Sequence, residues 1–319
     1  MPFWISVVGY LVIGTESPMN NRHSKLLVWV IVGGGLFVLF VVTLFALVLY
    51  TVRDDDGDTL SFGDNKIGVV ELSGVILESK SLIEQLQRFA ESASIRAIIL
   101  RIDSPGGGVA ASQEIFNEVL RLRKVKKKII VSSIASVGAS GAYYIACGTD
   151  KIIANPGTVT GSIGVIAEWI NYGELMKWAK LKNIVFKSGE LKDAPSPIRE
   201  LTVAEKKYLQ NIIDDMYIQF LTAVAEGRKL DVDKVRQLAD GRVFTGKDAK
   251  DKGLIDELGG LQEAVEITSK LVQITGEPKL VYPPRSKKGL LGLLFDDAST
   301  VLPMNSALDS RIQFSYVWK

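Results

Sequence analysis

Short runs of apolar, mostly β-branched residues alternate with amphipathic stretches through the first half of this 319-residue chain. Such runs predict buried strands, here at 67–72, 97–102, 128–131 and 152–154. Apolar residues at helical spacing predict helices at 82–90, 111–122 and, further along, 203–226. Strands that alternate with helices form parallel sheets joined by crossover helices, so the sequence predicts an α/β fold.

The most apolar part of the chain precedes this region. Residues 26–52 contain no charged side chain, and as a helix they would extend about 40 Å, beyond the roughly 30 Å hydrocarbon core of a membrane. We therefore predict one transmembrane helix there. Arg22 and Lys25 precede it, whereas Arg53 is followed by the acidic run 54–58. This bias predicts a single-pass protein of the inner (cytoplasmic) membrane, with a cytoplasmic N-terminus and an extracytoplasmic main domain.

The hydropathy pattern divides the chain into five parts. They are an N-terminal segment at 1–25, the transmembrane helix at 26–52, an acidic tether at 53–65, one large domain at 66–275 and a C-terminal extension at 276–319. Residues 1–14 are apolar but too short to cross a membrane, and no basic segment precedes them. Because Met19 opens a segment typical of a membrane anchor, we expect translation to begin there.

Composition excludes several kinds of site. The single cysteine, Cys147, cannot form an intramolecular disulfide, and with one histidine, His23, it cannot build a metal site of thiolates and imidazoles. We expect Cys147 to be a core residue, and we expect neither a metal nor a cofactor. The net charge of +2 gives no electrostatic reason to expect nucleic acid binding.

Ser140 is the candidate nucleophile. It lies among the small residues of 138–142, which leave space around its hydroxyl. The simpler alternative is that Ser140 only starts the helix that follows. A nucleophilic Ser140 could not use histidine as its base, because none follows His23. Lysine is the next side chain able to accept the proton, where its surroundings lower its pKa.

Three further segments carry glycines or polar residues suited to catalysis. The turn 103–108, Asp-Ser-Pro-Gly-Gly-Gly, follows a predicted strand; its N–H groups could bind an anion, or it is only a tight turn. In 160–164, Ser162 could orient a lysine amine, or the segment is a plain turn. In the loop 187–197, Lys192 could be a buried base, although most lysines are solvated surface residues.

Together and in this order, the motifs resemble the signal peptide peptidase A family. Its members are membrane-anchored bacterial proteases with a Ser/Lys dyad and a crotonase- or Clp-protease-like fold. The resemblance covers residues 66–264. It rests on the motifs at 103–108, 139–144, 160–165, 188–193 and 241–246.

The resemblance implies a role for each site residue. Ser140 would be the nucleophile, Lys192 the general base and Ser162 a hydrogen-bond partner of the lysine, while Gly107 and the Ser140 amide would bind the oxyanion. It also implies a homo-oligomeric ring in which serine and lysine come from neighbouring subunits. The implied substrates are remnant signal peptides, or other apolar peptides, bound at the membrane in an apolar groove.

Three other functions share parts of this pattern. Enoyl-CoA hydratases and isomerases have the same fold, but a membrane anchor argues against a coenzyme A substrate. A catalytically silent membrane scaffold is less consistent with an intact Ser140 and Lys192. Stomatin-operon proteases use the same dyad but usually carry more membrane spans, and the apolar run at 290–295 is too short for one.

Overall fold

The computed structural model describes residues 29, 32–46, 65–284 and 313–318. The chain divides into two compact units, Met1–Ser61 and Phe62–Lys319. In the first unit, residues 32–46 form a helix with exposed side chains. Among the residues that the model describes, no helix has both the length and the apolar character needed to cross a membrane. The span predicted at 26–52 extends past the described residues at both ends, and Met19 lies outside them.

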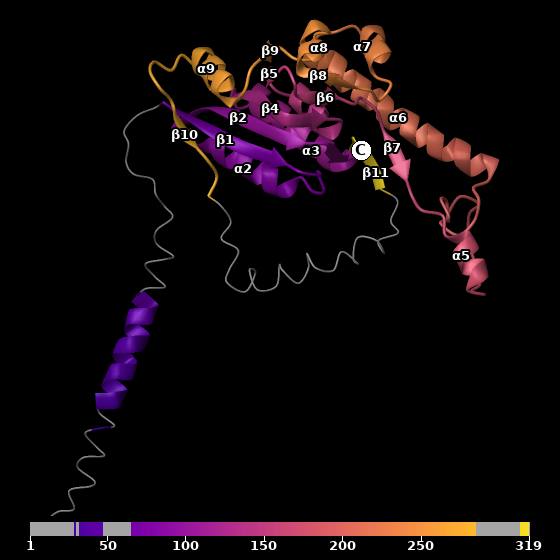
Figure 1. Ribbon diagram of the computed structural model, residues 1–319, viewed down its shortest axis with the longest axis horizontal. Coiled ribbons are helices and arrows are strands. Elements are labelled where there is room, and N and C mark those ends of the chain that lie inside the picture. The colour runs from indigo at the N-terminus through magenta and orange to yellow at the C-terminus, as the bar shows by residue number, and fades with distance from the viewer. Residues whose placement is uncertain (1–28, 30–31, 47–64, 285–312, 319) are drawn as a thin grey trace, which may run out of the picture. The chain divides into compact units, whose positions relative to one another are not determined.

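The second unit is built on an eight-stranded sheet (Figure 1). Its strands follow the order β10-β1-β2-β4-β5-β9, and β6 pairs with the far end of β4, then β8 with β6. All these pairs are parallel except β6–β8. The strands are β1 (Lys66–Ser73), β2 (Ile95–Ser104), β4 (Ile129–Ala139), β5 (Lys151–Ala154), β6 (Val159–Gly161), β8 (Val243–Thr245), β9 (Glu257–Leu258) and β10 (Lys279–Val281).

Three short strands form a second, antiparallel sheet. They are β3 (Gly106–Gly108), β11 (Gln313–Val317) and β7 (Ile166–Glu168), with β11 in the middle. The region predicted as a C-terminal extension therefore supplies β10 to the large sheet and β11 to the small one.

Helices cover both faces of the large sheet because its central strands are apolar on both sides. Alternate residues such as Val70 and Ile98 pack in the main core under α2 (Lys80–Glu91) and α3 (Val109–Lys124). Their neighbours Val69 and Ile99 pack in a second cluster with residues of α9 (Leu261–Leu271). This alternation on β1 and β2 is the period of two that a strand imposes.

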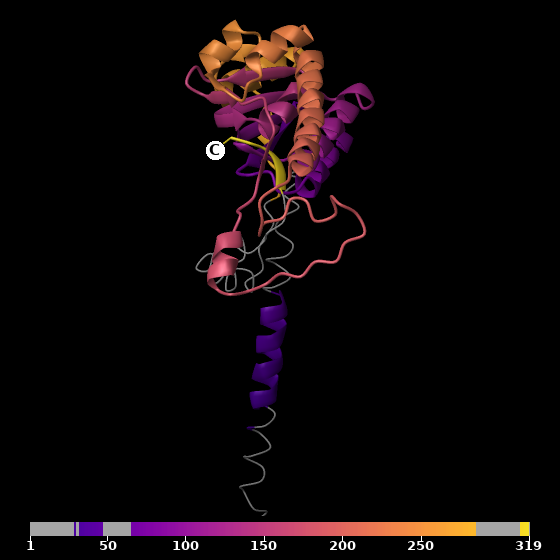
Figure 2. The ribbon, with the colours of Figure 1, turned by 90° about the vertical axis from the view of Figure 1, so that its right-hand side faces the viewer.

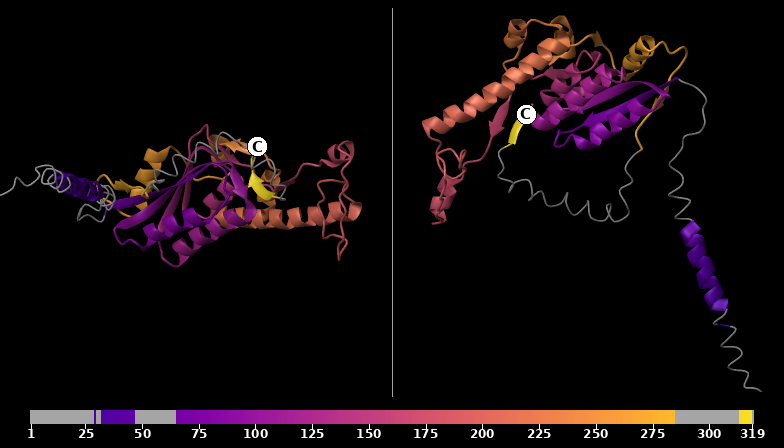
Figure 3. Two further views of the ribbon diagram at one scale, coloured as in Figure 1. Left: turned by 90° about the horizontal axis from the view of Figure 1, so that it is seen from below. Right: turned by 180° about the vertical axis from the view of Figure 1, so that it is seen from behind.

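The remaining helices lie toward the carboxyl ends of the strands. They are α4 (Gly141–Cys147), α5 (Gly173–Trp178), α6 (Val203–Arg228), α7 (Val232–Leu238) and α8 (Gly246–Asp251). The long helix α6 packs against α4 and α7 and projects beyond the sheet (Figures 2 and 3). The segment between α5 and α6 lies at this projecting N-terminal end (Figure 3).

The structure confirms the predicted α/β fold and each predicted strand and helix of the large domain. The strand predicted at 128–131 was too short, because β4 continues through Ser132 and Ser133 to Ala139. Both serines are buried, and their hydroxyls bond Thr149 and Arg101, so they do not end the strand. Several elements were not predicted, among them β6, β7, β8, β10 and β11.

Candidate active site

Ser140 lies at the junction between β4 and α4. Its backbone has φ 54° and ψ −118°, a conformation that costs a residue with a side chain about 1–3 kcal/mol. Its hydroxyl does not cap α4, as a serine that merely starts a helix would. Ser140 is also 1% exposed. The strained, uncapped backbone favours the nucleophile over the alternative of a structural helix-start residue.

Glycines on both sides allow this tight junction. A Cβ on Gly138 would lie 2.5 Å from Ile134 Cγ2, and one on Gly141 would lie 2.5 Å from Ser112 Oγ of α3. The first contact would obstruct the end of β4, and the second would push α4 away from α3. Glycine at both positions therefore lets the serine lie between a buried strand end and a closely packed helix.

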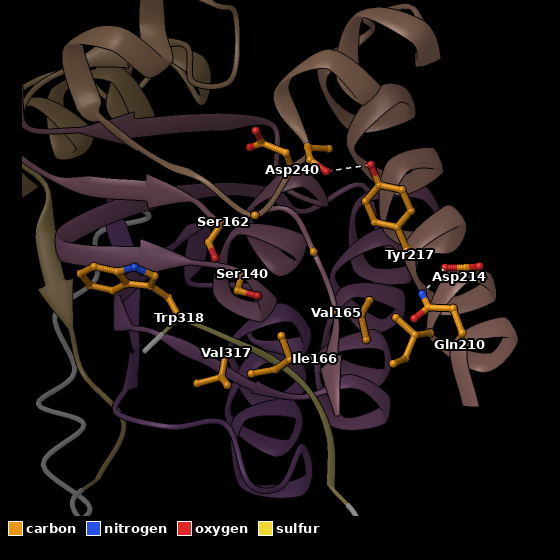
Figure 4. A pocket seen from close by; sticks show the side chains of 14 residues that line it. Ser140, Ser162, Val165, Ile166, Gln210, Asp214, Tyr217, Asp240, Val317 and Trp318 are labelled. Atoms are coloured by element: carbon orange, nitrogen blue, oxygen red, sulfur yellow. Dashed lines mark hydrogen bonds between the residues drawn. The ribbon is translucent and has the colours of Figure 1, made fainter. Parts of the chain in front are cut away.

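Ser140 opens into a cavity of about 480 Å³ (Figure 4). One wall comes from β7 and the residues before it, a second from α6, a third from the segment after α7, and a fourth from β11. The lining residues are Ser140, Ser162, Gly164, Val165, Ile166, Gln210, Ile213, Asp214, Tyr217, Ala239, Asp240, Gly241, Val317 and Trp318. The sequence did not predict the α6 and β11 walls, although it predicted an amphipathic helix at 203–226.

The structure brings the predicted Ser162 to the same cavity as Ser140. Ser162 follows β6, whose Gly161 pairs with Ala139 at the end of β4. Its own backbone also has a positive φ, 51°, and its N–H donates to Arg242 O at 2.9 Å. The parallel pairing of β4 and β6 thus places two serines, each just past a strand end, beside one another.

The Ser140 amide has a different role from the predicted one. It donates to Gly161 O at 2.8 Å, so it is not free to bind an oxyanion in this structure. The prediction failed because β6 was not recognised as the strand that pairs with β4 and accepts this bond. The bond instead fixes the turn that carries the Ser140 hydroxyl.

Gly107 lies in β3 and is not among the cavity-lining residues. Its chain runs so close to Ile76 that an added Cβ would lie 2.1 Å from Ile76 O. The neighbouring Gly106 approaches the backbone on both sides of Ser140. A Cβ added to Gly106 would lie 2.7 Å from Gly141 N and 3.0 Å from Ala139 O. The glycine turn is therefore packed directly against the serine junction.

An extended segment of the chain, β11, lies along this glycine strand. Tyr316 pairs with Gly107, and Trp318 N donates to Pro105 O at 2.8 Å. Tyr316 is fully buried, its ring stacked on Tyr144 with centroids 5.4 Å apart. Main-chain pairing with a buried side chain is the way that proteins bind extended peptides at a sheet edge.

Lys192 is not brought to Ser140. It is exposed, it does not line the cavity, and its N–H donates to Gly189 O at 3.2 Å. It belongs to an exposed segment that begins in α5 and continues toward α6, in which every residue from Lys177 to Lys192 is exposed. Of the four predicted site residues, one chain therefore brings together Ser140 and Ser162, with Gly107 in the neighbouring glycine turn and Lys192 apart.

No lysine or histidine is among the described side chains that line the cavity. The titratable ones are Asp214, Tyr217 and Asp240. The Arg242 guanidinium lowers the pKa of Asp240 to about 2, so this carboxylate is a poor proton acceptor. Burial raises the pKa of Tyr217, whose hydroxyl donates to Ala239 O at 2.7 Å (Figure 4). Among described residues, no group of three or more His, Cys, Asp or Glu could hold a metal.

The thiol of Cys147 does not compete as a nucleophile. It is buried on α4, as predicted, and burial raises its pKa to about 12. A thiol reacts as its thiolate, which this environment suppresses.

Comparison with known proteins agrees with this geometry. The model of peptidase family S49 matches residues 121–275, and the Clp protease model matches residues 70–158. Both matches include Ser140 and its junction. The expected Clp-protease-like fold is thereby confirmed.

Three relatives cover most of the large domain. A protein of Enterococcus faecium named "Putative signal peptide peptidase SppA" is 32% identical over 72% of its own length and 74% of this chain. A protein of Methanocaldococcus jannaschii, also named as a putative protease, is 32% identical over 88% of its length and 82% of this chain. "Serine protease SPPA, chloroplastic" of Arabidopsis thaliana is 32% identical over 36% of its length and 76% of this chain. The chain therefore belongs to the signal peptide peptidase A family, within peptidase family S49, and is a serine peptidase.

Proposed function

We propose that this serine peptidase is a membrane-anchored endopeptidase whose Ser140 is activated by Lys192 of a neighbouring subunit. The observation that carries this proposal is the composition of the cavity. A serine with a strained backbone lines it, yet none of its described side chains is a lysine or histidine. A nucleophilic serine needs a proton acceptor within hydrogen-bond reach, and in this proposal Lys192 of a second chain supplies it.

The exposed segment around Lys192 is the part of the chain that could reach such a neighbour. It projects with α6 beyond the sheet (Figure 3), and its large apolar side chains are exposed to solvent. Trp178 is 82% exposed, Ile184 76% and Phe186 94%. An exposed apolar group of this kind is typical of a subunit interface. Burial in that interface would also provide the apolar surroundings that keep a lysine amine neutral.

The reaction follows from these roles. Ser140 Oγ attacks the peptide carbonyl while the Lys192 amine accepts the hydroxyl proton. The amine then gives this proton to the leaving nitrogen. In the second half of the reaction the amine accepts a proton from the attacking water and returns it to Ser140 Oγ as the acyl–oxygen bond breaks. Ser162 holds the lysine amine, and backbone N–H groups of the glycine turn at Gly107 bind the oxyanion, a donor type worth about 3–4 kcal/mol each.

The substrate class follows from the anchor and the site. The apolar segment 26–52 would hold the enzyme in the membrane with its peptidase domain outside the cytoplasm. An extended peptide would take the place of β11 and pair with β3, whose edge β11 occupies in this structure. Remnant signal peptides, which are apolar and remain in the membrane, fit both requirements, in line with the name of the Enterococcus relative.

Mixing inactive subunits tests the shared site. Ser140→Ala and Lys192→Ala subunits should each be inactive, and an equal mixture should recover about one quarter of wild-type activity, the statistical share of sites that combine an intact serine with an intact lysine. Lys182→Ala, an exposed lysine of the same segment, is the matched control and should keep full activity. No recovery in a mixture that assembles like wild type would disprove sharing.

Covalent labelling tests the nucleophile itself. A fluorophosphonate probe should label the wild type at Ser140 and should not label Ser140→Ala. Labelling that persists in the variant would identify another nucleophile. Cleavage of a signal peptide held in vesicles, compared with a polar peptide of the same length, tests the substrate class.

A further inference from the structure

The exposed segment that carries Lys192 needs a means of fixing its position. From Lys177 to Lys192 no side chain is buried in the core of its own subunit. A base displaced by about 1 Å can lose about 100-fold in rate. The first buried residues after Lys192 are Pro195 and Ser196. Polar contacts that lie closer to Lys192 therefore contribute to its position.

Asp193, the residue after Lys192, makes such contacts with both carboxylate oxygens. Lys187 Nζ donates to Oδ1 at 2.6 Å, and Arg199 Nη2 donates to Oδ2 at 3.0 Å. The side chain of Asp193 is 22% exposed, although the segment around it is open to solvent. Lys187, followed by Arg199, lowers the pKa of Asp193, so the carboxylate stays charged and keeps both partners.

Arg199 connects Asp193 to a buried carboxylate at the start of α6. Its guanidinium donates to Glu205 Oε2 at 2.8 Å through Nη1 and to Oε1 at 2.5 Å through Nη2. The Glu205 side chain is 2% exposed, and it also accepts from Thr202 N at 2.8 Å in the capping box of α6. Two parallel bonds between guanidinium and carboxylate fix direction as well as distance.

We infer that Arg199 is a positioning residue for Lys192: it joins the Asp193 carboxylate to buried Glu205 and so fixes the lysine-bearing loop to the N-terminus of α6. This inference rests on the proposed role of Lys192 as base. Both terminal nitrogens of Arg199, Nη1 and Nη2, donate to carboxylates of this Asp193–Arg199–Glu205 network. A neutral or shorter side chain at position 199 would therefore release the loop. The nearby charged groups are Lys187, which shares Asp193, and Glu190, whose backbone O accepts from Lys187 Nζ at 2.7 Å.

A purely structural role for the network makes a different prediction. If Arg199 only stabilised α6, its loss would impair folding or assembly of the whole subunit. If it positions Lys192, its loss would impair one function of the subunit, supplying the base, and leave the other, supplying the serine, intact. Mixed assemblies separate these two functions.

The experiment combines Arg199→Gln with each inactive partner. Arg199→Gln alone should lower kcat by at least about tenfold with KM within about twofold, because peptide pairs with β3 and not with the network. Mixed with Ser140→Ala, which supplies a correctly placed Lys192, Arg199→Gln should recover about one quarter of wild-type activity. Mixed with Lys192→Ala, which supplies no lysine, it should show only the residual activity of Arg199→Gln itself. Asp193→Asn, which leaves the Arg199–Glu205 pair intact, should behave in the same way.

Arg121→Gln is the matched control. Arg121 pairs with the largely buried Glu118 at 2.6 Å on α3, away from the Lys192 segment, and its variant should keep wild-type kcat. Wild-type kcat in both Arg199→Gln and Asp193→Asn would overturn the inference. So would recovery with neither inactive partner, because that result indicates a subunit that fails as a whole.

A second readout keeps the inference separate from the proposed shared site. If Ser140→Ala and Lys192→Ala do not complement each other, subunit sharing is wrong, and rescue then decides the role of Arg199. Arg199 is 35% exposed at its side chain, so guanidinium ion can enter the gap left by Arg199→Ala. Restored kcat with guanidinium, but not with sodium at equal ionic strength, supports positioning. Unchanged kcat with guanidinium overturns it.

Discussion

Tyr316→Ala is expected to release β11 from the glycine strand beside Ser140. The Tyr316 ring is fully buried, stacked on Tyr144 and 4.8 Å from Phe220 between ring centroids. Its hydroxyl donates to Met216 O at 3.0 Å. These contacts add a side-chain attachment to the backbone pairing of β11 with β3 and β7.

The magnitude follows from the chemistry of the lost contacts. Removing a buried aromatic ring costs about 3–5 kcal/mol, and the hydroxyl bond adds about 0.5–1.5 kcal/mol. Together the two terms should increase local opening of β11 by a factor of roughly 300 to several tens of thousands. Tyr316→Phe keeps the ring and should increase opening by about tenfold or less.

Two measurements follow the opening. Hydrogen exchange of the amides in 313–318 should accelerate by these factors, and labelling of Ser140 by a fluorophosphonate should become faster as the β3 edge is uncovered. Tyr282→Ala, in which the replaced side chain is 49% exposed, is the control and should change neither rate. Exchange in Tyr316→Ala equal to that in Tyr316→Phe would refute the reasoning, because the ring would then contribute nothing to attachment.

Three other changes test the site and its supports. Gly107→Ala should abolish labelling of Ser140 and should lower the free energy of unfolding, measured by urea titration, by about 1–3 kcal/mol. Gly157→Ala is the control: its added Cβ has open space, so labelling and stability should both stay unchanged. Ser140→Gly should be inactive yet more stable than Ser140→Ala by about 1 kcal/mol, because glycine accepts φ 54° without strain; equal stabilities would show that the junction is relaxed. Arg199 lowers the pKa of Glu205 from 4.5 to about 2. The wild type should therefore have a larger free energy of unfolding than Glu205→Gln above pH 4.5, and this difference should disappear as the pH falls toward 2. A difference in urea midpoints that does not change with pH would contradict this.

The sequence was most informative where local pattern and burial coincide. The central strands β1 and β2 are β-branched runs buried on both faces, so their hydrophobicity alone identified them. The small neighbours of Ser140 made it only a candidate, and the resemblance of five motifs assigned its role, while the absence of any histidine after His23 already restricted the choice of base. These features depend on residues close together in the chain.

The short strands around the site were not predictable in this way. β6 and β11 hold few residues, and each becomes a strand through a partner distant in sequence. For β11 that partner is a row of glycines, which carries no hydrophobic signal. The Asp193–Arg199–Glu205 network was missed for the same reason, although the Thr202 and Glu205 spacing of a capping box marked one end of it.

By itself the sequence determined the α/β framework, the serine at a strand-to-helix junction and the side chains available for its chemistry, because periodicity, residue volume and composition act locally. The tertiary structure decided which of those side chains meet. Pairing of β4 with β6 placed Ser162 beside Ser140 and engaged the Ser140 amide, pairing of β3 with β11 covered the glycine edge, and the projection of α6 left Lys192 outside its own cavity. Each of these outcomes depends on hydrogen bonds and packing between segments far apart in the chain, which no local pattern encodes.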